Sequence, residues 1–144
     1  MKPFEVALRE YGTWEWPGSE HNPRVLQYFK EIGHAWVKDD ETAWCAAFVN
    51  WCLLQAGKPQ TGKLNARSFL EYGQGTESPV LGDLVVLWRI SRDSGFGHVG
   101  FFVRMSANSI YILGGNQSDQ VNIQKFPKTQ VLGYRKVPEV HKPQ

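Results

Sequence analysis

DDETAWCAAFVNWC, residues 39–52, is the stretch of the 144-residue chain that decides the fold. Acidic and hydroxyl residues give way here to a nearly all-apolar run, with Cys45 at the junction. Asp40 or Thr42 is suited to cap the start of a helix. The helix body reads AWCAAFVNWCLLQA, and the GKP sequence that begins at Gly57 is a normal stop. Apolar residues cover the body almost all the way round, which predicts a central, buried helix.

Shorter patterns on either side of this helix complete the secondary structure. An amphipathic stretch and an Asn-Pro helix start precede it, and short β-rich runs separated by turns follow it. Helices followed by neighbouring strands predict an α+β fold, with N-terminal helices packed on a mostly antiparallel sheet of about five strands. No repeat or linker interrupts the chain, so we expect a single catalytic domain over residues 1–144. The expected helices cover residues 3–11, 22–33 and 64–73, and the expected strands cover residues 82–89, 98–104, 110–116, 121–126 and 131–136.

Composition limits the classes of function. Lys plus Arg is 16 against 14 Asp plus Glu, and the net charge of +2 is too small to argue for a nucleic-acid partner. No run approaches the roughly 18 apolar residues of a membrane span, and the start MKPFEVALREYG lacks the apolar centre of a secretory signal. We therefore expect synthesis in the cytoplasm without a signal peptide, and no membrane insertion. Cys and His show no paired CxxC or HxxxH spacing, so we expect no metal and no cofactor.

The two cysteines differ in their position on the central helix. Cys45 and Cys52 are separated by about 10.5 Å along a helix axis, beyond the reach of a disulfide bond. Cys52 lies two turns inside the helix beside two leucines and is expected to be part of the core. Cys45 lies in the first turn, where free N–H groups and the helix dipole lower the pKa of a thiol and can hold an oxyanion. A cysteine in an apolar helix is more often a core residue, but this position makes Cys45 the candidate nucleophile.

His98 is the best placed of the four histidines to act as a base. It opens a strand in GFGHVGFFVR, where neighbouring glycines leave the ring room to approach another element. If Arg104 faces Ile110 across the next turn, then His98 faces Asn116, with Cβ atoms about 4.5–5.5 Å apart. Asn116 then accepts the Nδ1 hydrogen and leaves Nε2 for the thiol, as in a Cys-His-Asn triad. If the turn lies one residue earlier or later, His98 points to the other face of the sheet. A role for His98 as a strand-start residue hydrogen-bonded only to a loop therefore stays open as an alternative.

Four motifs in the order DETAWCAAFVNWCLLQAG, GDLVVL, GHVGFFV and ILGGNQSDQVN carry a family resemblance. They resemble the CHAP and NlpC-type cysteine amidases and endopeptidases, a papain-like superfamily that acts on bacterial cell walls. More closely, they look like the small CHAP-like proteins found among phage lysins and secreted antibacterial effectors. The similarity runs over about residues 20–134 and implies a papain-like fold.

The resemblance implies a role for each matching residue. Cys45 corresponds to the nucleophile, His98 to the general base and then acid, and Asn116 to the group that orients the histidine. Many CHAP domains place a glutamate two positions before the asparagine, where this chain has Gly114. The third position of the triad therefore depends on Asn116, with Asp119 as a substitute.

The resemblance also implies a substrate. Family enzymes cleave amide bonds in the peptide part of peptidoglycan through an acyl-enzyme thioester, and Trp44 and Gln117 are expected to line the cleft. Such a protein would act in the periplasm or cell wall after delivery by a phage holin or a secretion machine, the latter with a cognate immunity protein as a partner. Two alternatives remain open: a deamidase or transglutaminase-type toxin acting on proteins, and a non-catalytic module that binds the wall or a partner.

Overall fold

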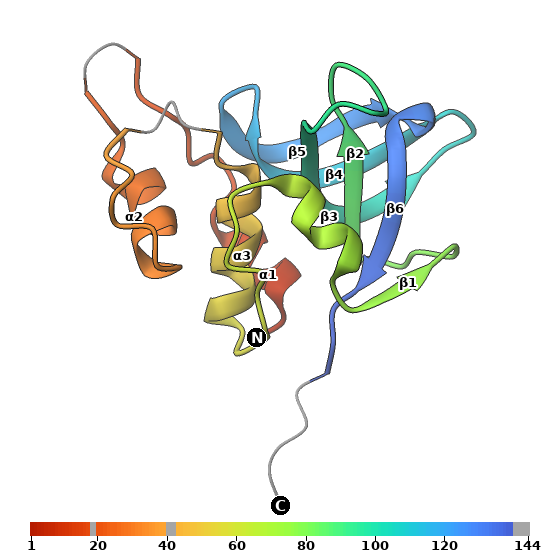
Figure 1. Ribbon diagram of the computed structural model, residues 1–144, viewed down its shortest axis with the longest axis horizontal. Helices are drawn as coiled ribbons and strands as arrows, with labels where there is room; N and C mark the ends of the chain where they lie inside the picture. The colour runs from red at the N-terminus through yellow and green to blue at the C-terminus, as the bar shows by residue number, and fades with distance from the viewer. Residues whose placement is uncertain (18–19, 40–42, 140–144) are drawn as a thin grey trace, which may run out of the picture.

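The computed structural model describes residues 1–17, 20–39 and 43–139, and in these residues most of the helices precede most of the strands (Figure 1). None of the helices in these ranges is long and apolar enough to cross a membrane. The elements in chain order are α1 (Pro3–Arg9), α2 (Pro23–Glu31), α3 (Cys45–Gln55), the 3-10 helix η1 (Ala66–Glu71), β1 (Gln74–Thr76), β2 (Leu84–Trp88), β3 (Gly97–Met105), β4 (Ser109–Gln117), β5 (Gln120–Pro127), the 3-10 helix η2 (Lys128–Gln130) and β6 (Val131–Lys136).

The strands within the described ranges form one six-stranded antiparallel sheet in the order β1-β6-β2-β3-β4-β5. The predicted α+β fold with N-terminal helices packed on an antiparallel sheet is confirmed (Figure 1). The additional strand is β1, whose sequence QGT is too short and too polar to have been recognised. The helix expected over residues 64–73 is a shorter 3-10 helix, η1.

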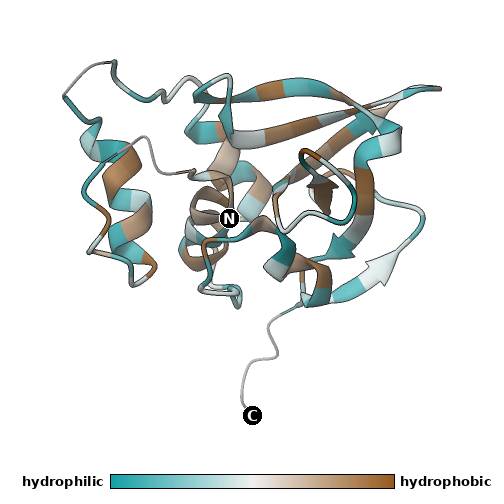
Figure 2. Ribbon diagram, turned by 45° about the horizontal axis from the view of Figure 1, so that its top comes forward, coloured by the Kyte–Doolittle hydropathy of each residue, from teal (hydrophilic) through white to brown (hydrophobic). Residues whose placement is uncertain are grey.

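The helix α3 is the central helix, as predicted. Every residue from Cys45 to Leu53 is buried. The ribbon of α3 is mostly hydrophobic in Figure 2, whereas that of α2 alternates between hydrophilic and hydrophobic residues. The helix begins later than the expected caps imply, because Trp44 is the N-cap and its side chain makes no capping hydrogen bond. Asp40 and Thr42, the predicted caps, lie outside the described residues.

A glycine lets α3 approach the sheet closely. A Cβ atom at Gly115 of β4 would lie 2.8 Å from both the Cβ atom of Phe48 and the Cζ3 atom of Trp44. Only a residue without a side chain fits such a contact between a strand backbone and a helix. The first turn of α3, which contains Cys45, is therefore held directly against β4.

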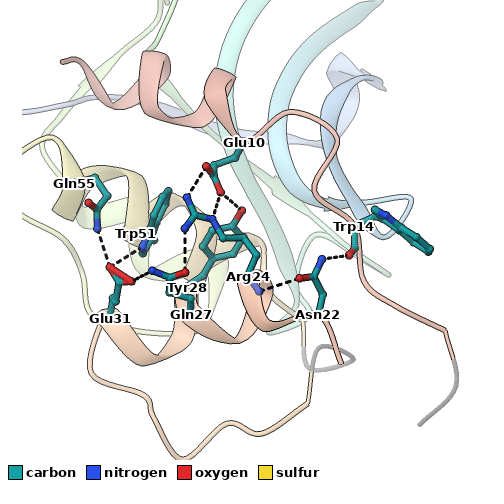
Figure 3. A network of polar contacts seen from close by, with 9 residues as sticks. All are labelled: Glu10, Trp14, Asn22, Arg24, Gln27, Tyr28, Glu31, Trp51 and Gln55. Carbon is teal, nitrogen blue, oxygen red and sulfur yellow. Dashed lines mark hydrogen bonds and ion pairs between the residues drawn. The ribbon is translucent and has the colours of Figure 1, made fainter. Parts of the chain in front are cut away.

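A polar network fastens α2 to the helices beside it (Figure 3). The carboxylate of Glu10 accepts hydrogen bonds from Arg24 at 2.6 and 2.8 Å and from the Tyr28 hydroxyl at 2.7 Å. Burial would raise the pKa of Glu10, but these hydrogen bonds and the charge of Arg24 outweigh it and hold the pKa below its ordinary value. On the other side of α2, Glu31 accepts a hydrogen bond from Trp51 of α3 at 3.3 Å. The network joins the end of α1, α2 and α3.

The hairpin of β3 and β4 departs from the predicted register. The predicted pairing of Arg104 with Ile110 is wrong, because Arg104 pairs with Tyr111. A β-bulge between Phe102 and Arg104 shifts the ladder by one residue. On the other side of the bulge, Phe102 pairs with Ile112, in the register that was predicted.

Candidate active site

The fold brings Cys45 and His98 together from distant parts of the sequence. Cys45 is the first residue of α3 and His98 is the second residue of β3. Each side chain shifts the pKa of the other, so the two groups lie within interacting distance, and the residues are only 5% and 6% exposed. Gly97, the residue before His98, lets β3 lie close to β2, since a Cβ atom there would lie 2.8 Å from the carbonyl oxygen of Leu87.

The pKa values of the two groups shift in opposite directions. Burial would raise the pKa of the Cys45 thiol, but the hydrogen bond and charge of His98 and the backbone amides of Val99 and Ala46 outweigh it and lower the pKa below its ordinary value. Burial would lower the pKa of His98, but hydrogen bonds with Cys45 and Gln117 outweigh it and raise this pKa. Both shifts favour a thiolate beside an imidazolium, the reactive form of a nucleophilic cysteine.

The second nitrogen of the imidazole is bound by Gln117. Nε2 of His98 lies 2.9 Å from Oε1 of Gln117. The amide nitrogen of Gln117 donates to the carbonyl oxygens of Ile112 and Asn122 at 3.0 and 2.9 Å. Because a carbonyl oxygen only accepts, these bonds fix the orientation of the amide and leave Oε1 for His98. Nε2 of His98 is therefore the donor, and Nδ1 is the nitrogen left for the Cys45 thiol.

The predicted geometry around Asn116 is wrong. The hydrogen bond of His98 runs from Nε2 to Gln117 rather than from Nδ1 to Asn116, so the two ring nitrogens have exchanged places relative to the prediction. The ladder between β4 and β5 shifts between Gly114 and Gln117, and Asn116 lies in this irregularity with a φ of 58°. The bulge turns the following residue, Gln117, toward the histidine.

Gly114 explains how a glutamine fits beside His98. A Cβ atom at Gly114 would lie 2.6 Å from Oε1 of Gln117. The side chain of Gln117 therefore occupies the space that a side chain at position 114 would need. A glutamate at position 114 and a glutamine at position 117 would compete for the same space, so the glycine at 114 is what allows Gln117 to reach His98. The signal in the sequence was the GGNQ run itself, in which two glycines precede two amides.

A cleft of about 520 Å³ opens beside His98. Asn116, Gln117 and Asp119 line it, but Trp44 does not. The expectation that Trp44 contacts substrate is wrong, because its side chain is fully buried and its indole N–H donates to the carboxylate of Glu15 at 2.9 Å. The lining residues are Glu15, Ala43, Leu87, Trp88, Arg89, His98, Asn116, Gln117, Ser118, Asp119, Gln124, Phe126 and Gln130.

The other cysteine and the remaining acidic and histidine side chains form no second centre in the described ranges. Cys45 and Cys52 are both free thiols, as predicted. Burial, together with the nearby charge of Glu10, raises the pKa of Cys52 well above its ordinary value, and the residue belongs to the core. Within residues 1–17, 20–39 and 43–139, no group of three or more His, Cys, Asp or Glu side chains could hold a metal ion.

A buried thiol of lowered pKa at the start of a helix lies beside an imidazole on an antiparallel sheet, an arrangement that resembles the cysteine–histidine pair of papain-like enzymes. The family model of the CHAP domain matches residues 37–116, more than half of the chain, and the chain belongs to this family. CHAP is a papain-like amidase/peptidase family, generally of cysteine-dependent amidohydrolases, and CHAP domains act on peptidoglycan. Comparison with curated proteins gives no match. The matched range contains Cys45 and His98 and ends one residue before Gln117.

Proposed function

We propose that the protein is a cysteine amidase or endopeptidase that cleaves amide bonds in the peptide part of bacterial peptidoglycan. The observation that carries the proposal is the pairing of Cys45 with His98. Burial is the main cause that raises the pKa of the core thiol of Cys52, whereas the pKa of Cys45, which is also buried, is lowered. Membership of the CHAP family supports the choice of substrate.

In the proposed reaction, the Cys45 thiolate attacks the carbonyl carbon of the amide and forms a C–S bond. The N–H groups of the first turn of α3, which have no acceptor within the helix, stabilise the resulting oxyanion. The C–N bond then breaks as Nδ1 of His98 gives its proton to the leaving amine, and a thioester remains.

Hydrolysis of the thioester returns the enzyme to its starting state. Nδ1 of His98 takes a proton from the attacking water, a new C–O bond forms and the C–S bond breaks. The products are a carboxylic acid and the regenerated thiolate–imidazolium pair. Gln117 holds Nε2–H throughout, so the plane of the ring and the direction of Nδ1 do not change.

The proposed substrate determines where the protein would work. Peptidoglycan lies outside the cytoplasmic membrane, so the proposal places the reaction in the periplasm or cell wall. A phage holin or a secretion machine would bring the protein to the cell wall. If the protein is a secreted effector, the cell that produces it would require an immunity protein.

The proposal is tested by mass spectrometry of purified peptidoglycan digested with the wild type, Cys45→Ala and Cys52→Ala. We expect the wild type and Cys52→Ala to release the same new fragments and Cys45→Ala to release none. Circular dichroism of all three proteins controls for folding, since Cys52→Ala leaves a small cavity in the core. Digestion by Cys45→Ala, or no digestion of walls from several bacterial classes, would contradict the proposal. Ammonia release from protein glutamine without new wall fragments would favour deamidase activity instead.

A further inference from the structure

The cleft beside His98 contains a positive charge without a partner. Arg89 directly follows β2 and lines the cleft. Its guanidinium group forms no ion pair or hydrogen bond with any residue of the described ranges. Glu15 and Asp119 line the same cleft, but neither is paired with Arg89, and their backbones are joined by a hydrogen bond of 2.8 Å. The guanidinium group of Arg89 is therefore not held by either carboxylate and can reach a ligand in the cleft.

The backbone holds Arg89 in a fixed position at the edge of the cleft. Its N–H donates to the carbonyl oxygen of Phe96, and its own carbonyl oxygen accepts from the N–H of Ser91 at 2.8 Å and the hydroxyl of Ser94 at 2.5 Å. The next residue, Ile90, has a φ of 69°, a conformation that strains a β-branched residue. These contacts close the loop of residues 89–96 on itself, so the backbone position from which the exposed Arg89 side chain extends is set before any ligand binds.

The charge of Arg89 opposes the reactive form of the site. Burial lowers the pKa of His98 and the charge of Arg89 lowers it further, against the hydrogen bonds with Cys45 and Gln117. An anion bound to Arg89 would cancel this repulsion at the moment when the imidazolium is needed. The planar fork of a guanidinium matches the two oxygens of a carboxylate, which makes a carboxylate the best-fitting anion.

We propose that Arg89 is a specificity residue that binds a free carboxylate of the substrate close to the bond that is cleaved. The inference rests on the proposed function and narrows its substrate to peptides with a free carboxylate near the scissile amide, as opposed to peptides amidated at that position. Arg92 belongs to the same loop but does not line the cleft, and it supplies a matched control.

Alkylation of Cys45 tests the inference without any wall substrate. Iodoacetate and iodoacetamide both form a C–S bond with the thiolate as iodide leaves, but only iodoacetate carries a carboxylate. We expect the ratio of the iodoacetate rate to the iodoacetamide rate to fall about tenfold in Arg89→Gln and to be unchanged in Arg92→Gln. Arg89→Lys, which keeps the charge but loses the fork, should give an intermediate ratio. An equal ratio in the wild type and Arg89→Gln, or an equal fall in Arg92→Gln, overturns the inference.

Cleavage of synthetic wall peptides separates this inference from the proposed function. In Arg89→Gln we expect kcat/KM to fall for the peptide with the free carboxylate, mainly through KM, and to change little for its amidated counterpart. A similar loss for both peptides overturns the inference while the proposed function stands. A ratio of alkylation rates that responds as expected, together with no cleavage of any peptide, contradicts the proposed function and supports the carboxylate site.

Discussion

Gln117, which binds the candidate catalytic residue His98, carries a neutral amide. Gln117 is 2% exposed, and its amide nitrogen is committed to the carbonyl oxygens of Ile112 and Asn122. A glutamate at this position would place a carboxylate oxygen against these two acceptors, which is unfavourable for all three groups. The imidazolium of His98 is therefore stabilised by a hydrogen bond from one side and by the thiolate charge of Cys45 from the other.

This arrangement predicts a change in the pH profile of Gln117→Ala. The hydrogen bond with Gln117 helps to raise the pKa of His98, so its loss lowers this pKa and the imidazolium disappears at a lower pH. The alkaline limb of the rate profile therefore moves to lower pH. The rate at the optimum falls on the order of tenfold to a hundredfold, because the ring is no longer held in place. The pH dependence of kcat/KM for peptide cleavage measures both effects.

Asn116→Gly is the matched control for the role of Gln117. Asn116 has a positive φ, which glycine adopts without strain, so this variant removes the side chain and preserves the backbone. We expect its alkaline limb to coincide with that of the wild type. A shift in Asn116→Gly with none in Gln117→Ala would restore Asn116 as the orienting residue.

At the scale of elements, the contact between α3 and β4 sets the distance between the thiol and the sheet. Gly115→Ala places a methyl group 2.8 Å from Phe48 and Trp44, so the helix must move away from the strand. We expect a loss of about 1–3 kcal/mol in the free energy of unfolding, typical of an overpacked core, together with slower alkylation of Cys45. Urea unfolding and alkylation rates measure the two effects.

A second strand glycine provides the comparison for Gly115→Ala. A Cβ atom at Gly133 of β6 would meet only the Cδ2 atom of Leu70, at 3.6 Å, which is an ordinary contact. Gly133→Ala is expected to leave both stability and alkylation nearly unchanged. If the two variants were equally stable, the close approach of α3 and β4 would not be what positions Cys45.

Elements with a strong local pattern were predictable from the sequence, and those set by tertiary contacts were not. The apolar run of α3 predicted a buried helix and the β-rich run of β3 predicted a strand, and both are present. The pairing of Cys45 with His98 was expected from their positions at the starts of these elements together with the resemblance to the CHAP family. Gln117 was misassigned because a β-bulge, which depends on packing in three dimensions, decides which of two adjacent amides faces the histidine.

At the scale of the whole molecule, the candidate site exists only when the two halves of the chain have come together. Cys45 belongs to the helical half, and His98 and Gln117 belong to the sheet. The same core cluster contains α3 residues and strand residues such as Phe101 and Leu113. A chain of this size usually unfolds in a single cooperative step, so the site should form and disappear with the core.

Labelling of Cys52 tests this cooperativity in the variant Cys45→Ala, which leaves one thiol. Cys52 is fully buried in the core, and burial raises the pKa of its thiol, so two barriers protect it in the folded chain. We expect its labelling by a neutral maleimide to begin at the urea concentration at which the fluorescence of the buried Trp44 and Trp51 changes, with the same midpoint. Labelling at lower urea would mean that α3 opens locally while the sheet stays folded. In that case the N-terminus of α3, and the thiol site built on it, would be lost before the domain unfolds.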